Sequence, residues 1–567
     1  MLKSKEAVYR LPENFFNKIS VCWQQHKAFF CILTLCLAYW VYLIFNSNMA
    51  VVFDALGYES IGRTIKEQGW LEYFRAGPQR EPFYPWTIAV SMGVADRLGV
   101  SYQFIQKIFQ ILGLFVTQIL LWILLGKLNV ARNMKLVVLL YFGFSPGLVN
   151  AALSLFSEIM VFPTVLMFLG AIVWAWRALL RPEKINAVQV GAVVALTFLL
   201  AIFNKGIFQY VFWVLLIPFG VICLQARRQH APKVFLNRLV FLITALVIVQ
   251  ACVGGFKGMN KKYNGNFVFT DRYSHLLFGN AYKRSRPLTP EVFGSQVASI
   301  PGGGVCRRFF TEKQCRYSDF YGADNFRMDT LMQILYAQEN IDILRLTLEE
   351  LFNYPWVQEV SPQEGDIKIL QLTLRDHFER PSKKHNIKNK RADEILGLVL
   401  EGIFIEPPPP KNFSEEERNS AILQLTFKEI LSNPFQYVLF MGMEFPRMFF
   451  WESTQIGFVE YPKWLYKIYT AEVFRGGLRL IVSLMTIFSL IFVLLHTFRH
   501  RVRLFDLTPA GYEIQICFFV LLTIFAYAGL YSFFSIVTRY ALPLGPLYLL
   551  CIAYTFSKIF SRQIYKK

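Results

Sequence analysis

Long apolar segments alternate with polar connections along most of this chain. An α-helix needs about 20 mainly apolar residues to cross the hydrocarbon core of a bilayer, so each such segment predicts a membrane span. The predicted spans are residues 29–45, 104–125, 136–152, 159–176, 188–203, 207–224, 239–253, 478–498, 514–534 and 540–556. The pattern predicts an α-helical polytopic membrane protein of about ten spans.

The basic residues give the orientation of these spans. Clusters of Lys and Arg follow the second, fourth, sixth, eighth and tenth spans, and basic residues favour the cytoplasmic side of a membrane. The clusters are Lys127, Arg132 and Lys135; Arg177, Arg181 and Lys184; Arg227, Arg228, Lys233 and Arg238; Arg499, Arg501 and Arg503; and Lys558, Arg562, Lys566 and Lys567. We therefore predict an integral protein of the inner (plasma) membrane with both termini in the cytoplasm.

This orientation places two long connections on the outer side, residues 46–103 and 254–477. Two apolar stretches in them, 81–99 and 433–451, are predicted to be helices lying at the outer interface, since a further span at 433–451 would break the charge alternation. The predicted domains are a membrane core (1–256) that includes the first outer loop, a mixed soluble outer domain (257–432), and a C-terminal interfacial helix with the last spans (433–567). Cys306 and Cys315 are the only cysteines of the outer domain, and a disulfide between them is left open.

Composition agrees with a membrane protein: 54% of the residues are hydrophobic, only 17% are charged, and the mean hydropathy is +0.37. The net charge of +20 is explained by topology and does not require nucleic acid as a partner. The nine cysteines form no CxxC pair and the seven histidines no HExxH motif, so the sequence contains no metal-binding signature.

The outer side carries a small set of charged residues that topology does not explain. Glu158, Lys205 and Arg539 stand in short outer connections, and ionisable residues at membrane depth are candidates for function. Snorkelling of the two cations to lipid headgroups is the alternative. Arg80 and Glu81 lie in the first outer loop, as does Asp54, directly after the first span. If the bundle closes, carboxylates that can take a proton and cations that can hold an anion meet in one outer cavity.

The order of several short motifs resembles a known class of enzymes. Asp54 after the first span is followed by REPFYPW (80–86), FSPGLVNAALSLFSE (144–158), NKG (204–206) and TRYALPLGP (538–546). This order resembles the integral-membrane glycosyltransferases of the GT-C class, in particular the lipid A aminoarabinose transferases and protein O-mannosyltransferases. The resemblance covers the membrane part from end to end, while residues 257–430 match no family.

The resemblance implies a sugar donor linked to a polyprenyl phosphate and an acceptor hydroxyl on a protein, lipid or envelope glycan, with the active site on the periplasmic (outer) side and inversion at the anomeric carbon. It implies catalytic roles for Asp54, as the base, and for Glu158 and Glu81. Lys205, Arg539 and Arg80 would bind the donor phosphate, and Tyr58 and Tyr540 would contact substrate.

Two points qualify the resemblance. The aminoarabinose transferase pattern in the first loop is closer to Glu-Lys-Pro, whereas this chain reads Arg80-Glu81-Pro82, which leaves the roles of Arg80 and Glu81 open. Some members of the class hold a divalent metal between acids of the first two outer loops. Asp54 and Glu158 match those acids, and a site without cofactor or metal is the preferred interpretation.

Three other classes of protein remain as alternatives. An envelope polysaccharide polymerase would also be polytopic with a large outer loop, but would not be expected to combine Asp54 with the late RYALP motif at 539–543. A transporter or flippase of lipid-linked sugars usually shows repeat symmetry or paired broken helices, and no internal repeat is visible in the sequence. A non-catalytic scaffold would tolerate substitution of the outer charges.

Overall fold

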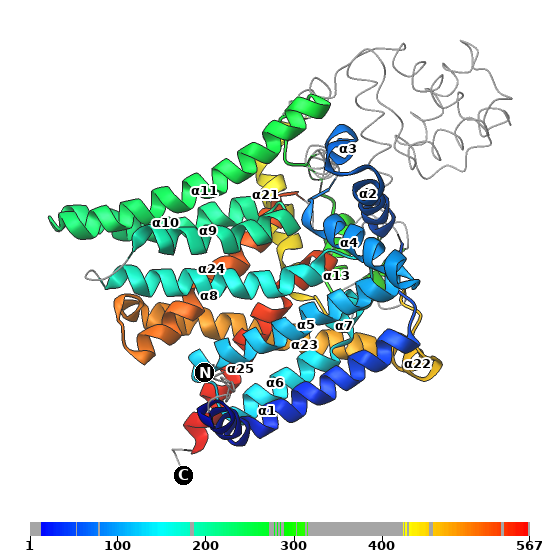
Figure 1. Cartoon of the computed structure of the whole chain (residues 1–567), viewed down its shortest axis with the longest axis horizontal. Helices are drawn as coiled ribbons and strands as arrows, with labels where there is room; N and C mark the ends of the chain where they lie inside the picture. The colour runs from blue at the N-terminus through cyan, green and yellow to red at the C-terminus, as the bar shows by residue number, and fades with distance from the viewer. Residues whose placement is uncertain are drawn as a thin grey trace, which may run out of the picture.

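The computed structural model describes a helical bundle whose long helices run between two ends (Figure 1). The structure describes residues 13–311, residue 315 and residues 423–564, with short gaps at 53, 78–79, 182–185, 271–276, 278–280, 282–283, 285–287, 302, 312–314, 424–425, 428–429, 453–457 and 535–537. Nine described helices are long and apolar enough to cross a membrane, and a bent helix pair raises the possible number to ten. The prediction of an α-helical polytopic membrane protein is thereby confirmed.

The helices follow the predicted spans closely. They are α1 (Glu13–Asn46), α5 (Tyr102–Lys127), α6 (Arg132–Phe144) with α7 (Pro146–Leu153), α8 (Glu158–Leu180), α9 (Ala187–Asn204), α10 (Phe208–Arg228), α11 (Pro232–Asn264), α23 (Glu472–Arg499), α24 (Pro509–Phe534) and α25 (Gly545–Ile564). A lipid-facing stripe is plain on α23, where Leu484, Phe488, Ile491 and Leu495 are all exposed at helical spacing. The described residues contain isolated β-bridges but no named strand.

The two ends of the bundle differ in chemistry. At the first, which we call the basic end, Trp176 of α8 donates from Nε1 to the carbonyl of Leu504 at 2.8 Å, and Lys558 of α25 pairs with Glu513 of α24 at 2.6 Å. The short helix η3 (Arg501–Phe505) and the start of α11 also lie here (Figure 1). At the second, which we call the loop end, α2 (Asp54–Gln68), α3 (Trp70–Arg75) and α4 (Phe83–Leu98) gather around the ends of the spans (Figure 1). Those members of the Lys and Arg clusters that the structure describes lie at the basic end, as the charge pattern predicts.

The topology of the bundle leads to a direct test. Reporter tags at the C-terminus and next to Arg501 should be read as cytoplasmic, because η3 lies at the basic end and α25 ends there. A tag next to Lys388, which lies outside the described residues, should be read on the outer side. A cytoplasmic signal from the Lys388 tag would contradict the orientation, since residues 254–477 must then lie on the same side as the basic clusters.

One predicted span, 136–152, is broken. Helices α6 and α7 meet at an angle of 43°. Pro146 has no N–H to continue the first helix, and Ser145 caps the second by accepting from the Leu148 N–H at 3.3 Å. The buried carboxylate of Glu452 holds the break by accepting from Ser145 Oγ at 2.6 Å and from the Gly147 N–H at 2.7 Å. The chain is thereby directed to the loop end just before Glu158.

The seventh predicted span is longer than expected. Helix α11 has 33 residues, or about 50 Å at 1.5 Å per residue, whereas the hydrocarbon core is about 30 Å thick. Its last turns pack on α3, where Phe256 contacts the ring of Phe74 and the side chain of Asn264 donates to the Phe74 carbonyl at 2.9 Å. The helix therefore passes residue 256, the predicted end of the membrane core, and supports the first outer loop.

The two stretches expected at the interface are also helical. Residues 81–99 contain α4, and residues 433–451 contain α21 (Pro434–Glu444) followed by η1 (Phe445–Phe449). Helix α4 packs on α2 and α5 and buries Tyr84 and Ile88 completely. The predicted soluble domain falls mostly on residues outside the described part of the chain.

Cys306 and Cys315 form a disulfide, with their Cα atoms 5.8 Å apart. We isolate the protein from cells under non-reducing conditions and denature it. A maleimide reagent should then leave Cys306 and Cys315 unmodified, and it should label both once a reductant has converted the disulfide to thiols. Mass spectrometry of the peptides measures this, with Cys31 and Cys252, exposed free thiols, as internal controls that react in both conditions. Labelling of Cys306 before reduction would contradict the pairing.

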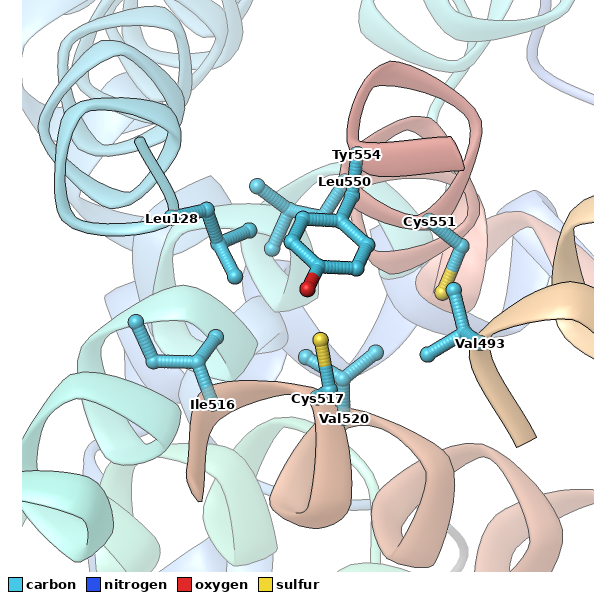
Figure 2. Close-up of a pocket in the computed structure, with 8 residues that line it drawn as sticks. All are labelled: Leu128, Val493, Ile516, Cys517, Val520, Leu550, Cys551 and Tyr554. Carbon is cyan, nitrogen blue, oxygen red and sulfur yellow. The ribbon is translucent and has the colours of Figure 1, made fainter. Parts of the chain in front are cut away.

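The core between the spans is closely packed. A small void of about 10 Å³ lies between Cys517 of α24 and Cys551 of α25 and is otherwise lined by apolar side chains and Tyr554 (Figure 2). It has room for at most one water molecule and has an apolar surface, so it is not a ligand site. The candidate side chains for binding or transforming a substrate are charged groups at the loop end of the bundle.

Candidate functional site

Six charged side chains that lie far apart in sequence meet at the loop end of the bundle. Asp54 is the first residue of α2, and Arg80 and Glu81 precede α4. Glu158 is the first residue of α8, Lys205 lies between α9 and α10, and Arg539 lies in η4 (Thr538–Leu544) before α25. We call these six residues the charged cluster. Ion pairs join five of them, and Glu81 contacts the backbone next to Lys205, so the structure brings the predicted carboxylates and cations together at one place.

Asp54 lies between two arginines. Arg80 donates from Nη2 to Asp54 Oδ1 at 2.7 Å, and Arg539 donates from its own Nη2 to Asp54 Oδ2. The side chain of Asp54 is 21% exposed, against 11% for Arg80 and 9% for Arg539. Asp54 is thus the most accessible of the three, while both of its oxygens accept from a guanidinium.

These contacts set the protonation state of Asp54. Burial alone would raise the pKa of the Asp54 carboxyl, but the positive charges of Arg80 and Arg539 and their hydrogen bonds outweigh it and hold this pKa well below its usual range. The carboxylate is therefore ionised at neutral pH. The same contacts make it a poor proton acceptor until at least one guanidinium is drawn away.

The depressed pKa of Asp54 predicts an acid-dependent contribution to stability. A carboxyl whose pKa is lowered on folding stabilises the protein above its unfolded pKa of about 4, and this stabilisation is lost as the pH falls toward the folded pKa. The melting temperature of the Asp54→Asn variant should lie below that of the wild type at pH 7, and the gap should narrow as the pH falls below about 4. Thermal unfolding of both proteins in detergent between neutral and acid pH measures the gap.

Asp96→Asn is the matched control for this measurement, because Asp96 pairs with Lys66 on the same outer layer but has an exposed side chain. An exposed ion pair contributes little, so this variant should follow the wild type at every pH. If the difference in melting temperature between the wild type and Asp54→Asn does not change with pH, Asp54 is not the ionised carboxylate that stabilises the folded protein.

The second ion pair of the cluster is more deeply buried. Lys205 Nζ lies 2.7 Å from Glu158 Oε1, and the two side chains are 10% and 4% exposed. Burial would lower the pKa of the Lys205 ammonium, but the neighbouring carboxylate of Glu158 outweighs this effect and raises it. Lys205 is therefore charged at neutral pH although its side chain is almost completely buried.

Arg539 joins the two ion pairs. Its Nη2 contacts Asp54, and its Nε lies 3.6 Å from Glu158 Oε1. One guanidinium thus bridges the two carboxylates that the sequence places in different outer loops. Since it occupies the position between them, Asp54 and Glu158 as arranged do not fit a divalent metal, and no three His, Cys, Asp or Glu side chains group as ligands among the residues described.

Glu81 differs from the other carboxylates. Its Oε1 accepts from the backbone N–H of Gly206 at 2.8 Å, which ties the first outer loop to the NKG connection. Its other oxygen makes no hydrogen bond or ion pair with any residue that the structure describes. Glu81 is therefore the carboxylate of the cluster whose second oxygen is available to a substrate.

Aromatic rings surround the cations. The Arg80 guanidinium lies 4.8 Å from the ring centre of Tyr58, and Lys205 Nζ lies 5.3 Å from that of Tyr540. Arg539 lies over Phe156 at 4.9 Å and near Tyr540 at 5.7 Å. Both tyrosines predicted to contact substrate therefore lie next to cations of the charged cluster. Phe156 was not predicted, and the signal that points to it is its position two residues before Glu158.

A hydrogen-bonded layer beneath the cluster fixes its loops. Tyr58 and Ser157 are joined through their hydroxyls at 3.1 Å. Gln110 of α5 accepts from the Tyr84 hydroxyl at 2.7 Å and donates to the carbonyls of Ala152 and Ser154 at 2.8 and 2.9 Å. These bonds connect α2, α4 and α5 to the segment that leads into Glu158. They were not predicted from the sequence.

The backbone also holds the first two outer loops together. The Ala50 N–H donates to the carbonyl of Leu153 at 3.1 Å, and the Leu155 N–H donates to the carbonyl of Ala50 at 2.9 Å. This short parallel bridge pairs Ala50 with Ser154, which lie four residues before Asp54 and four before Glu158. The relative position of the two carboxylates is therefore set by the backbone as well as by Arg539.

Comparisons with known proteins give no relative: no protein-family model matches the chain, and no curated protein is significantly similar to it in sequence. We therefore infer the function from the geometry and charges of the charged cluster.

Proposed function

We propose that the protein is an integral-membrane glycosyltransferase that moves a sugar from a polyprenyl-phosphate-linked donor to an acceptor hydroxyl at the loop end of the bundle. The observation that carries the proposal is the pair of buried cations, Arg539 and Lys205, beside carboxylates in a site almost closed to water. Cations in such a place stabilise a growing negative charge without first reorganising solvent.

The chemistry of this transfer requires both kinds of group. The acceptor oxygen attacks the anomeric carbon as the bond from that carbon to the phosphate oxygen breaks, so the configuration inverts. The acceptor proton goes to a carboxylate, and the lipid phosphate leaves with the bonding electrons. In our proposal, Arg80, Lys205 and Arg539 neutralise the charge on the departing phosphate.

Asp54 is the proposed base, and its contacts suggest how it becomes active. A donor phosphate would compete with Asp54 for the Nη2 groups of Arg80 and Arg539. Once a guanidinium turns to the phosphate, the carboxylate regains affinity for a proton and can accept it from the acceptor hydroxyl. The base would then be active only when donor is bound, which disfavours side reactions in its absence.

Glu158 and Glu81 have supporting roles in this scheme. Glu158 orients Lys205 and Arg539, and its side chain is too deeply buried to meet an acceptor directly. Glu81, with one available oxygen, is placed to hold a sugar or acceptor hydroxyl and is the second candidate for the base. Tyr58 and Tyr540 offer ring faces to the sugar.

The proposed cellular setting follows from the charge pattern and the resemblance to GT-C enzymes. The protein would lie in the inner (plasma) membrane with both termini in the cytoplasm and the charged cluster facing the periplasmic side. The acceptor would be a protein, a lipid or an envelope glycan that approaches from that side.

Mass spectrometry of envelope lipids and glycans, from cells with and without the protein, tests the proposal. We expect one polyprenyl-phosphate sugar to accumulate in its absence and one glycan, glycolipid or glycoprotein to lose that sugar. Wild type and Asp96→Asn should restore the normal pattern, whereas Asp54→Asn should not. An unchanged pool of polyprenyl-phosphate sugars would overturn the proposal, and accumulation of a lipid-linked repeat unit in place of a single sugar would favour the polymerase.

A further inference from the structure

We propose that the basic end of the bundle carries a binding site for the headgroup of an anionic phospholipid. A cavity of about 480 Å³ opens there, at the opposite end of the bundle from the charged cluster. We call it the basic-end pocket, and its lining consists of Leu180, Ile222, Gln225, Arg228, Gln229, Arg238 and Phe505. This inference is independent of the proposed transferase function.

Two arginines give the pocket its charge, and they differ in the number of hydrogen bonds that they already make within the protein. Arg238 of α11 donates from Nη1 to the Ile222 carbonyl at 2.6 Å and from Nε and Nη2 to the Leu179 carbonyl at 3.3 Å. It is thus held between the last turn of α8 and the Ile222 carbonyl, six residues before the end of α10, and two of its five N–H groups remain for a ligand. Arg228 is exposed and has no hydrogen bond or ion pair with any described residue.

Carbonyls at the ends of helices near the pocket affect the binding of an anion. The last carbonyls of a helix carry partial negative charge and would repel a phosphate. Arg238 caps the end of α8 through the Leu179 carbonyl, and at the end of α10 the carbonyls of Gln225, Ala226 and Arg227 accept from the backbone N–H groups that follow, so these helix ends do not cancel the charge of Arg228. The amides of Gln225 and Gln229, both on the lining, add neutral donors.

The rest of the lining suits a lipid better than a free anion. Leu180, Ile222 and Phe505 form apolar walls, and Phe505 is 49% exposed. The pocket lies where α8 and α10 end, the level at which headgroups meet the acyl chains, and basic pockets between spans at this level bind anionic headgroups. The volume lies in the usual range for small-molecule sites and accommodates a phosphoglycerol group with the first carbons of its chains.

Native mass spectrometry of the full chain in detergent, titrated with dioctanoyl phosphatidylglycerol, tests the site. Saturable binding should weaken roughly tenfold in Arg228→Gln, the loss expected for one charge-assisted hydrogen bond to phosphate. Arg227→Gln is the matched control. Arg227 is the neighbouring exposed arginine on α10 and does not line the pocket, so its replacement removes the same charge without changing the affinity more than about twofold.

Further arms identify the ligand. Dioctanoyl phosphatidylcholine should bind more weakly than phosphatidylglycerol at equal concentration, and inorganic phosphate should not displace the lipid. Equal losses in Arg227→Gln and Arg228→Gln would overturn the proposal, because they would indicate a diffuse basic surface. Displacement by inorganic phosphate, or equal binding of the zwitterionic lipid, would overturn it as well.

Discussion

Replacing Asp54 with Asn should slow glycosyl transfer by about 10²- to 10⁴-fold, the usual contribution of a positioned general base. The amide keeps the shape of the carboxylate and one acceptor oxygen for a guanidinium, but it cannot take up the acceptor proton. Donor binding should not weaken, since the cations that hold the phosphate remain and the competing carboxylate is gone. The measurement is single-turnover transfer by the purified variant at saturating donor.

Three further variants separate catalysis from folding. Asp96→Asn should transfer at the wild-type rate, because Asp96 pairs with an exposed Lys66 outside the charged cluster. Asp54→Glu retains the charge between Arg80 and Arg539 and should keep the thermal stability of the wild type while losing most of its activity. If Asp54→Asn transfers within about threefold of the wild type, Asp54 is not the base, and a loss in Glu81→Gln would move that role to Glu81.

Replacing Arg539 or Lys205 with Met should weaken binding of polyprenyl phosphate by about 10- to 150-fold, the value of a charge-assisted hydrogen bond of about 1.5–3 kcal/mol. Arg539→Lys should recover only part of the loss, because Arg539 contacts Asp54 and Glu158 through different nitrogens and an ammonium cannot reproduce that planar geometry. Binding can be followed by native mass spectrometry, with the melting temperature measured in parallel.

Two controls distinguish this result from a general loss of charge. Arg475→Met removes an exposed cation at the start of α23, outside the charged cluster, and should not change the affinity. Polyprenol, which lacks the phosphate, should bind wild type and Arg539→Met equally. If Arg539→Met, Lys205→Met and Arg539→Lys all bind polyprenyl phosphate like the wild type, the two cations do not hold a phosphate, and snorkelling to headgroups becomes their explanation.

The spans could be predicted from the sequence because hydropathy and the positions of basic residues are local signals that act along the whole chain. The break in the span 136–152 was missed, although Ser145 followed by Pro146 is a recognisable start of a new helix. The apolar run continues through these residues, so a hydropathy pattern cannot separate one straight span from two bent helices.

The members of the charged cluster could be predicted, but not their pairing. Alternating spans place Asp54, Glu158, Lys205 and Arg539 at one end, and an unexplained charge at that depth is visible in the sequence. Which cation meets which carboxylate depends on packing between distant segments, as in the contact between Asp54 and Arg539, 485 residues apart. The sequence alone does not show that Arg539 bridges Asp54 and Glu158. It also does not show that both oxygens of Asp54 accept from a guanidinium.

In the proposed function, the charged cluster receives the phosphate of a lipid-linked donor. Cryo-electron microscopy of the purified protein with polyprenyl phosphate tests it most directly. We expect phosphate density within hydrogen-bonding distance of Arg539 and Lys205, with Asp54 released from at least one of its two guanidinium contacts. Phosphate density elsewhere, with both contacts of Asp54 intact, would contradict it.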